Sequence, residues 1–411
     1  MASFVVGLRR FLGALALLLL AHQAAAAEPL AFVGRSGSKL VVNGSPFLFN
    51  GFNAYWLMNV ASEDQAKVSK TLSDAAAAGL TVCRTWAFND GGNPSLQSSP
   101  GVYNEKMFQG LDFVVSEAKN HSIRLILSLV NNFKDYGGRS QYVQWARDAG
   151  ESIQTDDDFY TNAKVKQYYK NHVQKVLTRV NTITKVAYKD DPTILSWELM
   201  NEPRCEVDYS GQTVTAWVKE MAAYTKSIDS KHLLQVGFEG FYGNSTPDKI
   251  KLYNPNGYQL GTDFITSNQV NEIDYTTIHA YPDIWLQGQS EEARKTFLQQ
   301  WFSSHWNDSV KVLGKPLVFA EFGKSKTAPG YSQKVRDDFF SYVYDVIYSD
   351  AETSGGSFSG GLVWQVMGDG MESYYDGYEV VLSQDSTTTA VIKKQSDAMA
   401  ALEKRLSGSH H

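Results

Sequence analysis

The stretch ILSWELMNEP at residues 194–203 is an apolar run that ends at a proline. Pro203 has no backbone N–H to donate within a sheet, so a central strand has to stop just before it. The run is the fourth of eight apolar or β-branched runs, and most of them start 34 to 44 residues apart. The eight runs start near Phe47, Thr81, Arg124, Ile194, Leu233, Tyr275, Pro316 and Gly360.

The spacing of these runs predicts the fold class. Each interval can hold a strand, a loop, a helix and a return loop, and helical patterns occupy residues 69–78, 110–119 and 214–227. Alternating strands and helices predict a parallel sheet, and eight repeats predict that it closes into an α/β fold, the (β/α)8 TIM barrel. An open doubly wound sheet is the alternative, but no glycine-rich phosphate-binding fingerprint follows the first strand.

Two further features modify this barrel. Asn43-Gly44 lies between apolar runs and predicts an N-terminal β-hairpin. The interval from residue 124 to residue 194 is the longest, and it carries a segment with several Tyr and Trp residues at 131–145. We expect this segment to form an extended βα loop over the mouth of the barrel, where functional loops gather.

The N-terminus resembles a targeting segment. Arg9 and Arg10 precede an apolar run at residues 11–21, and four alanines follow at 24–27. This order predicts a secretory signal peptide at residues 1–27, since the run is shorter than the roughly 20 residues that cross a bilayer. We therefore expect a secreted, extracellular protein that is not attached to a membrane after signal removal, with one domain at 28–405 and a disordered tail at 406–411.

Composition excludes some classes of protein. The 411 residues are 43% hydrophobic, which excludes a disordered chain, and the net charge of −6 without a long Lys/Arg run argues against nucleic acid as a partner. Aromatic residues make up 13%, which indicates either a large core or a cleft with exposed rings. Cys83 and Cys205 are expected to be buried free thiols, although one bridge is possible. Glycosylation sequons lie at Asn43, Asn120, Asn244 and Asn307.

Two glutamates lie where a barrel enzyme carries its catalytic groups. In this fold the catalytic groups lie at the C-terminal ends of the strands. Glu202 closes the fourth run, and Glu321 lies near the end of the seventh run, before Gly323. Two opposed carboxyls over one cleft are what glycosidic bond cleavage requires. Either one alone is more often a capping or ion-pairing group, so the prediction rests on the pair.

Other runs end in polar and aromatic side chains. His279 and Tyr281 are two residues apart, so they share one strand face and can both reach the cleft. Arg84 and Trp86 share a face of the second run, and a buried Arg needs a carboxylate partner, for which we choose Glu321. That pairing would hold Glu321 ionised. Cys83 is next to Arg84 in the same run, so its side chain should point to the opposite face of the strand, toward the helices.

Trp364, at the end of the eighth run, is a candidate floor for a sugar or a core residue. No His pair has the spacing of a zinc protease, and no serine-hydrolase elbow, P-loop or Cys–His signature occurs. We therefore expect no catalytic metal and no cofactor.

Taken together, these segments resemble plant endo-β-1,4-mannanases of glycoside hydrolase family five. The resemblance covers the whole chain after the signal segment, from about residue 29 to 402. Its matching segments are CRTWAFNDGG (from Cys83), SLVNNF (from Ser128), YGGRSQYVQWAR (from Tyr136), SWELMNEPRC (from Ser196), GFEGFYG (from Gly237), TIHAYPD (from Thr277), FAEFGKS (from Phe319) and VWQ (from Val363).

The resemblance implies roles for these residues. Glu202 would be the acid/base and Glu321 the nucleophile of a retaining hydrolase. Asn201 would bind the 2-hydroxyl of the sugar beside the scissile bond. The sugar would lie on Trp364, while Arg84, His279 and Tyr281 would position Glu321.

The implied substrate is β-mannan, glucomannan or galactomannan of the plant cell wall, cleaved by a monomeric glycoprotein with possible transglycosylation. A β-1,4-glucanase and a non-catalytic mannan-binding protein are the alternatives.

Overall fold

The computed structural model describes residues 30–408. The chain divides into two units, Met1–Ala31 and Phe32–His411, and the fold described below is that of the second unit. The expected signal peptide at 1–27 lies outside the described residues.

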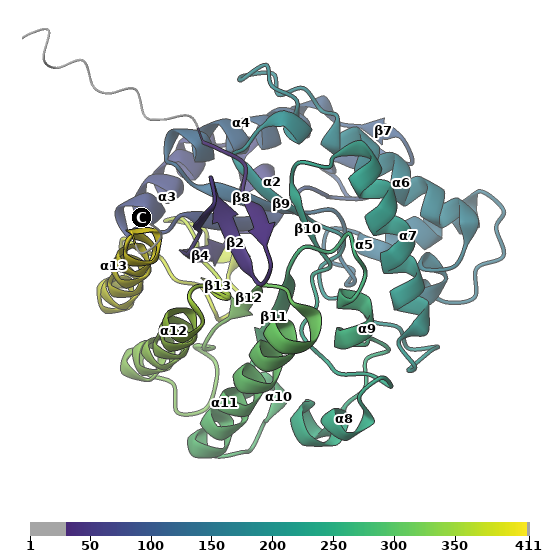
Figure 1. Ribbon diagram of the computed structural model, residues 1–411. Coiled ribbons are helices and arrows are strands. Elements are labelled where there is room, and N and C mark those ends of the chain that lie inside the picture. Colours follow the sequence, from purple (N-terminus) through teal and green to yellow (C-terminus); the bar gives the residue numbers. More distant parts are fainter. Residues whose placement is uncertain (1–29, 409–411) are drawn as a thin grey trace, which may run out of the picture. The chain divides into compact units, whose positions relative to one another are not determined.

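Eight strands form one sheet with a parallel pairing at every step, in the order β10-β9-β8-β5-β4-β13-β12-β11 (Figure 1). At the two ends of this order, the backbone N–H of Asp274 donates to the carbonyl of Leu234 and that of His279 to Glu239, both at 2.8 Å. The sheet therefore closes into the predicted (β/α)8 barrel. Its strands are β4 (Phe49–Asn53), β5 (Val82–Trp86), β8 (Arg124–Ser128), β9 (Ile194–Glu198), β10 (Leu233–Gln235), β11 (Thr276–Ala280), β12 (Leu317–Phe322) and β13 (Phe358–Val363).

Helices surround the sheet (Figure 1). Several begin at a side chain that accepts from their first turn: Asp64 accepts from the N–H of Lys67, and Asn162 from Lys164 and Val165. The α-helices are α2 (Leu57–Ala61), α3 (Gln65–Ala77), α4 (Glu105–Asn120), α5 (Gly138–Asp148), α6 (Ala163–Leu177), α7 (Gln212–Ile228), α8 (Pro247–Tyr253), α9 (Phe264–Asn268), α10 (Pro282–Trp285), α11 (Glu291–Asp308), α12 (Gln333–Ser354) and α13 (Ser386–Gly408). Short helical turns are η1 (Asp156–Phe159), η2 (Tyr188–Asp190), η3 (Pro255–Gly257), η4 (Ser309–Leu313) and η5 (Glu372–Tyr374).

The predicted hairpin closes one end of the barrel. Strands β1 (Gly34–Ser36), β2 (Lys39–Val42) and β3 (Ser45–Pro46) pair antiparallel, with a turn at Asn43 and Gly44 where both φ angles are positive. Leu40 of β2 packs with Phe49 and Val82, which lie at the starts of their strands. A small two-stranded ribbon, β6 (Gln97–Ser99) with β7 (Val102–Tyr103), lies apart from the barrel sheet. The opposite end of the barrel, where the strands finish, is left for the site.

Two of our expectations need correction. The segment at 131–145 is a loop at the mouth of the barrel only in its first part. Its second part belongs to α5, where Tyr142 and Trp145 pack on each other and are buried with ring centroids 5.1 Å apart. The expected tail at 406–411 starts too early, because α13 continues to Gly408 and Leu406 packs against the core. Of the expected tail, residues 409–411 lie outside the described residues.

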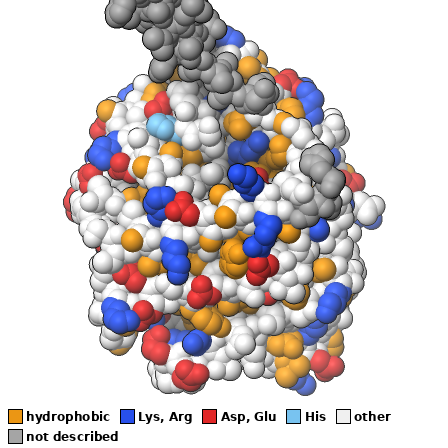
Figure 2. Space-filling model, turned by 60° about the vertical axis from the view of Figure 1, so that its left-hand side comes forward, with side chains coloured by type: hydrophobic (Ala, Val, Ile, Leu, Met, Phe, Trp, Pro, Cys, Tyr) orange, Lys and Arg blue, Asp and Glu red, His pale blue; other side chains and the backbone are white. Residues whose placement is uncertain are grey.

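The cysteines follow the prediction. Cys83 and Cys205 are both free and buried, and Cys83 belongs to the apolar cluster between the strands and the helices. Among residues 30–408, no helix has the length and hydropathy to span a bilayer. On the face shown in Figure 2, basic and acidic side chains are interspersed and do not gather in blocks.

Candidate active site

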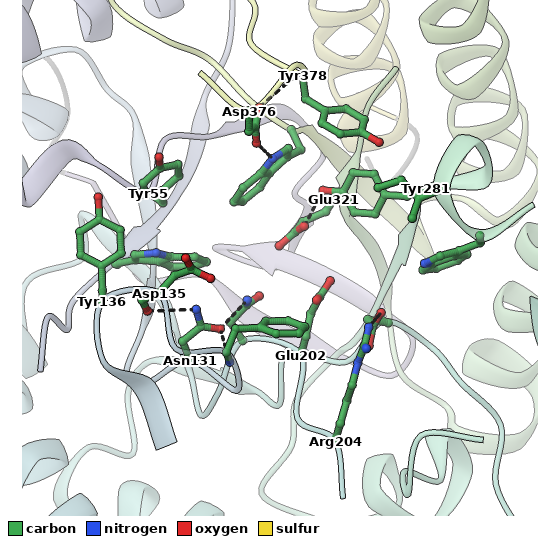
Figure 3. A pocket seen from close by; sticks show the side chains of 17 residues that line it. Tyr55, Asn131, Asp135, Tyr136, Glu202, Arg204, Tyr281, Glu321, Asp376 and Tyr378 are labelled. Atoms are coloured by element: carbon green, nitrogen blue, oxygen red, sulfur yellow. Dashed lines mark hydrogen bonds and ion pairs between the residues drawn. The ribbon is translucent and has the colours of Figure 1, made fainter. Parts of the chain in front are cut away.

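A cavity of about 550 Å³ lies at the C-terminal ends of the strands (Figure 3). Each of the eight barrel strands supplies at least one side chain to its lining, at the end of the strand or soon after it. Taken in the chain order of the strands, these residues include Tyr55, Trp86, Asn131, Glu202, Glu239, Tyr281, Glu321 and Trp364. The predicted site residues Glu202, Glu321, Asn201, Tyr281, Trp86 and Trp364 all line this one cavity.

Glu202 and Glu321 approach each other across the cavity. One carboxylate oxygen of each lies within 4.8 Å of the other, and both residues are at most 9% exposed. Glu202 has a φ of 49°, a left-handed conformation that non-glycine residues rarely adopt and that costs about 1–3 kcal/mol. Its backbone N–H donates to the carbonyl of Gly237 at 2.9 Å. A Cβ on Gly237 would lie 2.0 Å from the carbonyl of Met200, so only glycine fits there.

Arg84 connects the carboxylates from within the barrel. It is fully buried, and its guanidinium donates to Glu321 at 2.6 Å, the contact expected from the sequence. The same guanidinium also makes a bidentate pair with Glu198, at 2.7 Å for both bonds, and donates to Asn201 at 2.6 Å and Asn53 at 3.0 Å. Because a buried guanidinium is costly without such partners, these bonds hold it in one place.

Glu198 is a site residue that the sequence reasoning missed. It is fully buried, and it also accepts a bond from Gln235. The alternation of side chains along β9 could have revealed it, because Glu198 and Ser196 lie on the same face of the strand. Ser196 faces the barrel interior, where its hydroxyl is hydrogen-bonded to that of Tyr275 at 2.7 Å. Arg84 therefore pairs with two carboxylates, and Arg84, Glu198 and Glu321 form one buried charged cluster.

His279 and Tyr281 reach different carboxylates. The hydroxyl of Tyr281 donates to Glu321 at 2.6 Å, as the resemblance implied. Nδ1 of His279, however, lies 2.6 Å from Oε1 of Glu202 and 3.6 Å from Oε2 of Glu321. His279 therefore lies within ion-pair distance of Glu321, as the resemblance implied, but its hydrogen bond goes to Glu202.

The site also changes the acidity of these groups. Burial raises the pKa of Glu202, and the positive charges of Arg204 and Arg84 oppose that rise. Burial raises the pKa of Glu321 as well, against the opposing effects of His279, Arg84 and the Tyr281 hydroxyl. We expected the pair with Arg84 to hold Glu321 ionised; Arg84 does lower the pKa of Glu321, together with His279 and Tyr281, but the raising effect of burial is larger. Burial lowers the pKa of His279, which favours the neutral ring.

Aromatic rings form one wall of the cavity. The rings of Tyr55 and Trp364 are stacked with centroids 5.8 Å apart, and Trp86 lies 6.3 Å from Trp364. The indole N–H of Trp364 donates to Asp376 at 2.8 Å, which fixes the plane of the ring. The guanidinium of Arg84 lies 5.0 Å from the centre of the Trp86 ring, which is a cation–π distance. Arg84 therefore contacts both the aromatic wall and the carboxylates.

A second ion pair was also missed. Arg204 makes a bidentate pair with Glu239 at 2.9 and 2.7 Å, and both residues line the cavity. Burial and the charge of Glu202 raise the pKa of Glu239 to about 7, while Arg204 opposes the rise. Both residues lie inside the segments on which the resemblance rests. Their pairing could not be read there, because 35 residues separate them in sequence.

The side chain of Asn201 is held by hydrogen bonds, and the neighbouring cluster of Glu202, His279 and Glu321 has the spacing of a metal site. Asn201 accepts from Arg84 and donates to Asn131 at 3.0 Å, so its orientation is determined. Glu202, His279 and Glu321 each bring one ligand atom within 4.8 Å, the spacing of a metal site. Arg84 lies 2.6 Å from Glu321, however, and a guanidinium so close disfavours a second cation there.

Comparison with known proteins gives consistent matches. The model of the family described as GH family 5 beta-mannosidase-like matches residues 30–404. Mannan endo-1,4-beta-mannosidase 5 of Solanum lycopersicum is 59% identical over 373 residues, covering 90% of this chain and 89% of that protein. Mannan endo-1,4-beta-mannosidase 1 of Oryza sativa subsp. japonica is 55% identical over 376 residues, or 91% and 87%.

Solved structures agree with these matches. The endo-beta-1,4-mannanase from Thermotoga petrophila superimposes with a TM-score of 0.75 at 32% identity, covering 90% of this chain and 79% of that one. The endo-1,4-beta-mannanase from Rhizomucor miehei has a TM-score of 0.75 at 33% identity, covering 90% of this chain and 100% of that one.

Proposed function

Because the chain belongs to the GH family 5 beta-mannosidase-like family, we propose that it hydrolyses internal β-1,4-mannosidic bonds of mannans. The observation that carries the proposal is the pair of buried carboxylates, Glu202 and Glu321, whose oxygens come within 4.8 Å in a cavity walled by aromatic rings. Carboxyl groups about 5–5.5 Å apart are typical of retaining glycosidases, whereas inverting enzymes leave about 6.5–9.5 Å for a water. This separation favours the retaining mechanism.

The two carboxyls take complementary roles in this mechanism. Glu321, ionised, attacks the anomeric carbon while protonated Glu202 gives its proton to the leaving oxygen, and a mannosyl ester of Glu321 forms. Glu202 then takes a proton from water, whose oxygen attacks the anomeric carbon and releases Glu321. Attack by a sugar hydroxyl in place of water gives transglycosylation.

The surrounding groups support this division of labour. Burial raises the pKa of Glu202, which suits the carboxyl that has to be protonated when it acts as the acid. Arg84 and Tyr281 donate to Glu321 and stabilise its carboxylate. Asn201, oriented by Arg84 and Asn131, is the proposed partner of the 2-hydroxyl, and Trp364 supports the sugar face.

The location of the protein is part of the proposal. A signal segment at 1–27 would direct the enzyme, as a monomer, to the cell wall, where mannan, glucomannan and galactomannan are its substrates. Of the sequons, Asn43, Asn120 and Asn244 are exposed and are the proposed glycan sites. Asn307 is half-buried, and its amide donates to the carbonyl of Ser303 at 2.7 Å, which disfavours its modification.

Activity across four polymers tests the proposal. We expect release of reducing ends from mannan, glucomannan and galactomannan and little release from cellulose. Proton NMR should show the β-anomer of the product first, since retention preserves the configuration of the bond. An initial α-anomer would exclude the retaining mechanism, release from cellulose alone would favour a glucanase, and binding without release would favour a binding protein.

The Tyr281→Phe substitution tests the proposed state of Glu321. The Tyr281 hydroxyl lowers the pKa of Glu321 by donating to its carboxylate, so removing this hydroxyl raises that pKa. The attack needs ionised Glu321, so the acid side of the kcat/KM profile should move to higher pH by about one unit. Tyr55→Phe is the control, because that hydroxyl donates to the carbonyl of Tyr374. An acid side that stays in place in Tyr281→Phe would contradict the assignment.

A further inference from the structure

Arg139 and Asp157 form a buried ion pair outside the catalytic cavity. Arg139 lies in the first turn of α5 and Asp157 lies in η1, and the two residues are 7% and 3% exposed. Neither residue lines the cavity, so neither is placed to touch a sugar bound there. Because charged groups are costly to bury, their further partners indicate what the pair holds in place.

Asp157 holds the segment that follows β9. Its carboxylate accepts from the backbone N–H groups of Glu206 at 2.7 Å and Val207 at 2.9 Å, which are the second and third residues after Arg204. Tyr160, just after η1, donates its hydroxyl to the carbonyl of Arg204 at 2.9 Å. The backbone of Arg204 and of the residues after it is therefore fixed by η1 and its C-terminal neighbour.

Arg139 holds the segment that follows β8. Its guanidinium donates to the carbonyl of Asn132 at 3.2 Å, and its backbone N–H donates to the carbonyl of Asn131 at 2.8 Å. The side chain of Asn132 in turn accepts from the backbone N–H of Arg204 at 3.2 Å. The ion pair therefore joins the segments after β8 and β9, and Arg204 lies where these segments meet.

Arg204 lines the cavity on the side from which the leaving group departs. Its side chain is 30% exposed, and its guanidinium lies 5.1 Å from the centre of the Phe133 ring, which also lines the cavity. In the proposed mechanism Glu202 protonates the leaving oxygen, so the sugar attached to that oxygen lies beside Glu202. Figure 3 shows Arg204 on the opposite side of Glu202 from Asp376. Asp376 bonds the indole of Trp364, which supports the sugar that stays on the enzyme.

We propose that the Arg139–Asp157 pair is a positioning element for the sugar on the leaving-group side, and that it acts through Arg204. The inference rests on the proposed function and concerns the choice of leaving group and acceptor. With the pair intact, Arg204 is held ready for the departing sugar and, once the ester has formed, for an acceptor sugar whose hydroxyl replaces water. A leaving group without a sugar does not need the pair.

Asp157→Asn tests this role on two substrates. The amide has an acceptor oxygen on one side only, so it cannot serve both Arg139 and the two backbone N–H groups. The kcat/KM on mannohexaose should fall about tenfold, mainly through KM, which is the worth of one hydrogen bond to a charged group. On an aryl β-mannotrioside with a nitrophenol leaving group, kcat/KM should stay within about twofold. Capture of the ester by added mannotriose, relative to water, should also fall.

Asp112→Asn is the matched control. Asp112 lies on α4 and is likewise buried, pairs with Arg179 at 2.6 Å and accepts from the backbone N–H of Thr182 at 3.0 Å, but it does not line the cavity. This variant should lower the unfolding temperature as Asp157→Asn does and leave the ratio of the two substrates unchanged. An equal loss on both substrates in Asp157→Asn would make the Arg139–Asp157 pair purely structural and overturn the proposal.

A double variant tests the route through Arg204. Arg204→Ala should itself lower kcat/KM on mannohexaose, and adding Asp157→Asn should lower it by no more than about twofold further. A further tenfold loss would show that Asp157 acts independently of Arg204, against the proposal.

Arg139→Lys decides the question if Asp157→Asn does not fold. Lysine keeps the charge but lacks the planar fork that reaches Asp157 and Asn132 together. The ratio of mannohexaose to aryl mannotrioside should fall severalfold, and an unchanged ratio would overturn the positioning role. If the unmodified enzyme cleaves neither substrate, the proposed function fails and the positioning role fails with it. Cleavage of both substrates with no change of ratio in the variants removes the positioning role alone.

Discussion

Replacing Glu321 by alanine is expected to lower kcat on mannan by at least about 10⁴-fold, because no other group can form the covalent intermediate. The fold should survive this change. Arg84 keeps its bidentate pair with Glu198 at 2.7 Å and its bond to Asn201, so the guanidinium is not left unpaired. Activity assays, with thermal unfolding and mannan binding measured on the same preparation, check the expected result.

Glu202→Ala separates the two roles. On mannan it should lose activity as Glu321→Ala does, but on an aryl β-mannoside, whose leaving group needs no proton, it should still form the ester and show a burst of phenol. Glu321→Ala should show no burst. Glu63→Ala, at an exposed position outside the cavity, is the control for losing a carboxylate. Turnover above about a tenth of the normal rate in Glu321→Ala would disprove its assignment as the nucleophile.

Replacing Arg84 by methionine is the second change with a large expected effect. Glu198 and Glu321 would then be buried without their cation, and breaking a buried ion pair in this way costs about 3–5 kcal/mol of stability. We also expect a large loss of kcat, since Glu321 loses the donor at 2.6 Å that stabilises its charge and position. Chemical unfolding and kcat on mannan check the two effects separately.

Arg336→Met is the matched control for Arg84→Met. Arg336 is likewise fully buried, and it lies on α12, where it donates to Asp385 at 2.8 Å and to Thr388 at 2.9 Å. Its loss should lower stability by a comparable amount and leave kcat of the folded enzyme near normal. If Arg84→Met also kept a normal kcat, Arg84 would be a purely structural residue.

The candidate site could be predicted in part. Glu202 and Glu321 were found because each follows an apolar run, and in a barrel every such position lies at the same end. Glu198 and the Arg204–Glu239 pair were missed. Their function depends on partners that are 114 and 35 residues away, and no local pattern reports such a distance.

Strict alternation would have placed Glu321 wrongly. In β12, Val318 and Ala320 face the barrel interior, whereas Phe319 faces the helices. Glu321 is two residues after Phe319, so regular alternation would also point Glu321 at the helices. The register between β12 and β13 shifts between Phe319 and Phe322, and this irregularity turns Glu321 into the cavity. A shift in pairing is a property of two strands, so one strand's sequence does not reveal it.

The amino-acid sequence by itself determined the eight strands, the hairpin, and the strand ends where the two glutamates stand. These features follow from the periodicity of apolar residues and from local turn residues, which act within a few positions along the chain. Only the tertiary structure decided that His279 bonds Glu202, that Arg84 also holds Glu198, and that the Arg139–Asp157 pair joins the segments after β8 and β9. Such contacts arise when the barrel closes, because closure brings together strands that are far apart in the sequence.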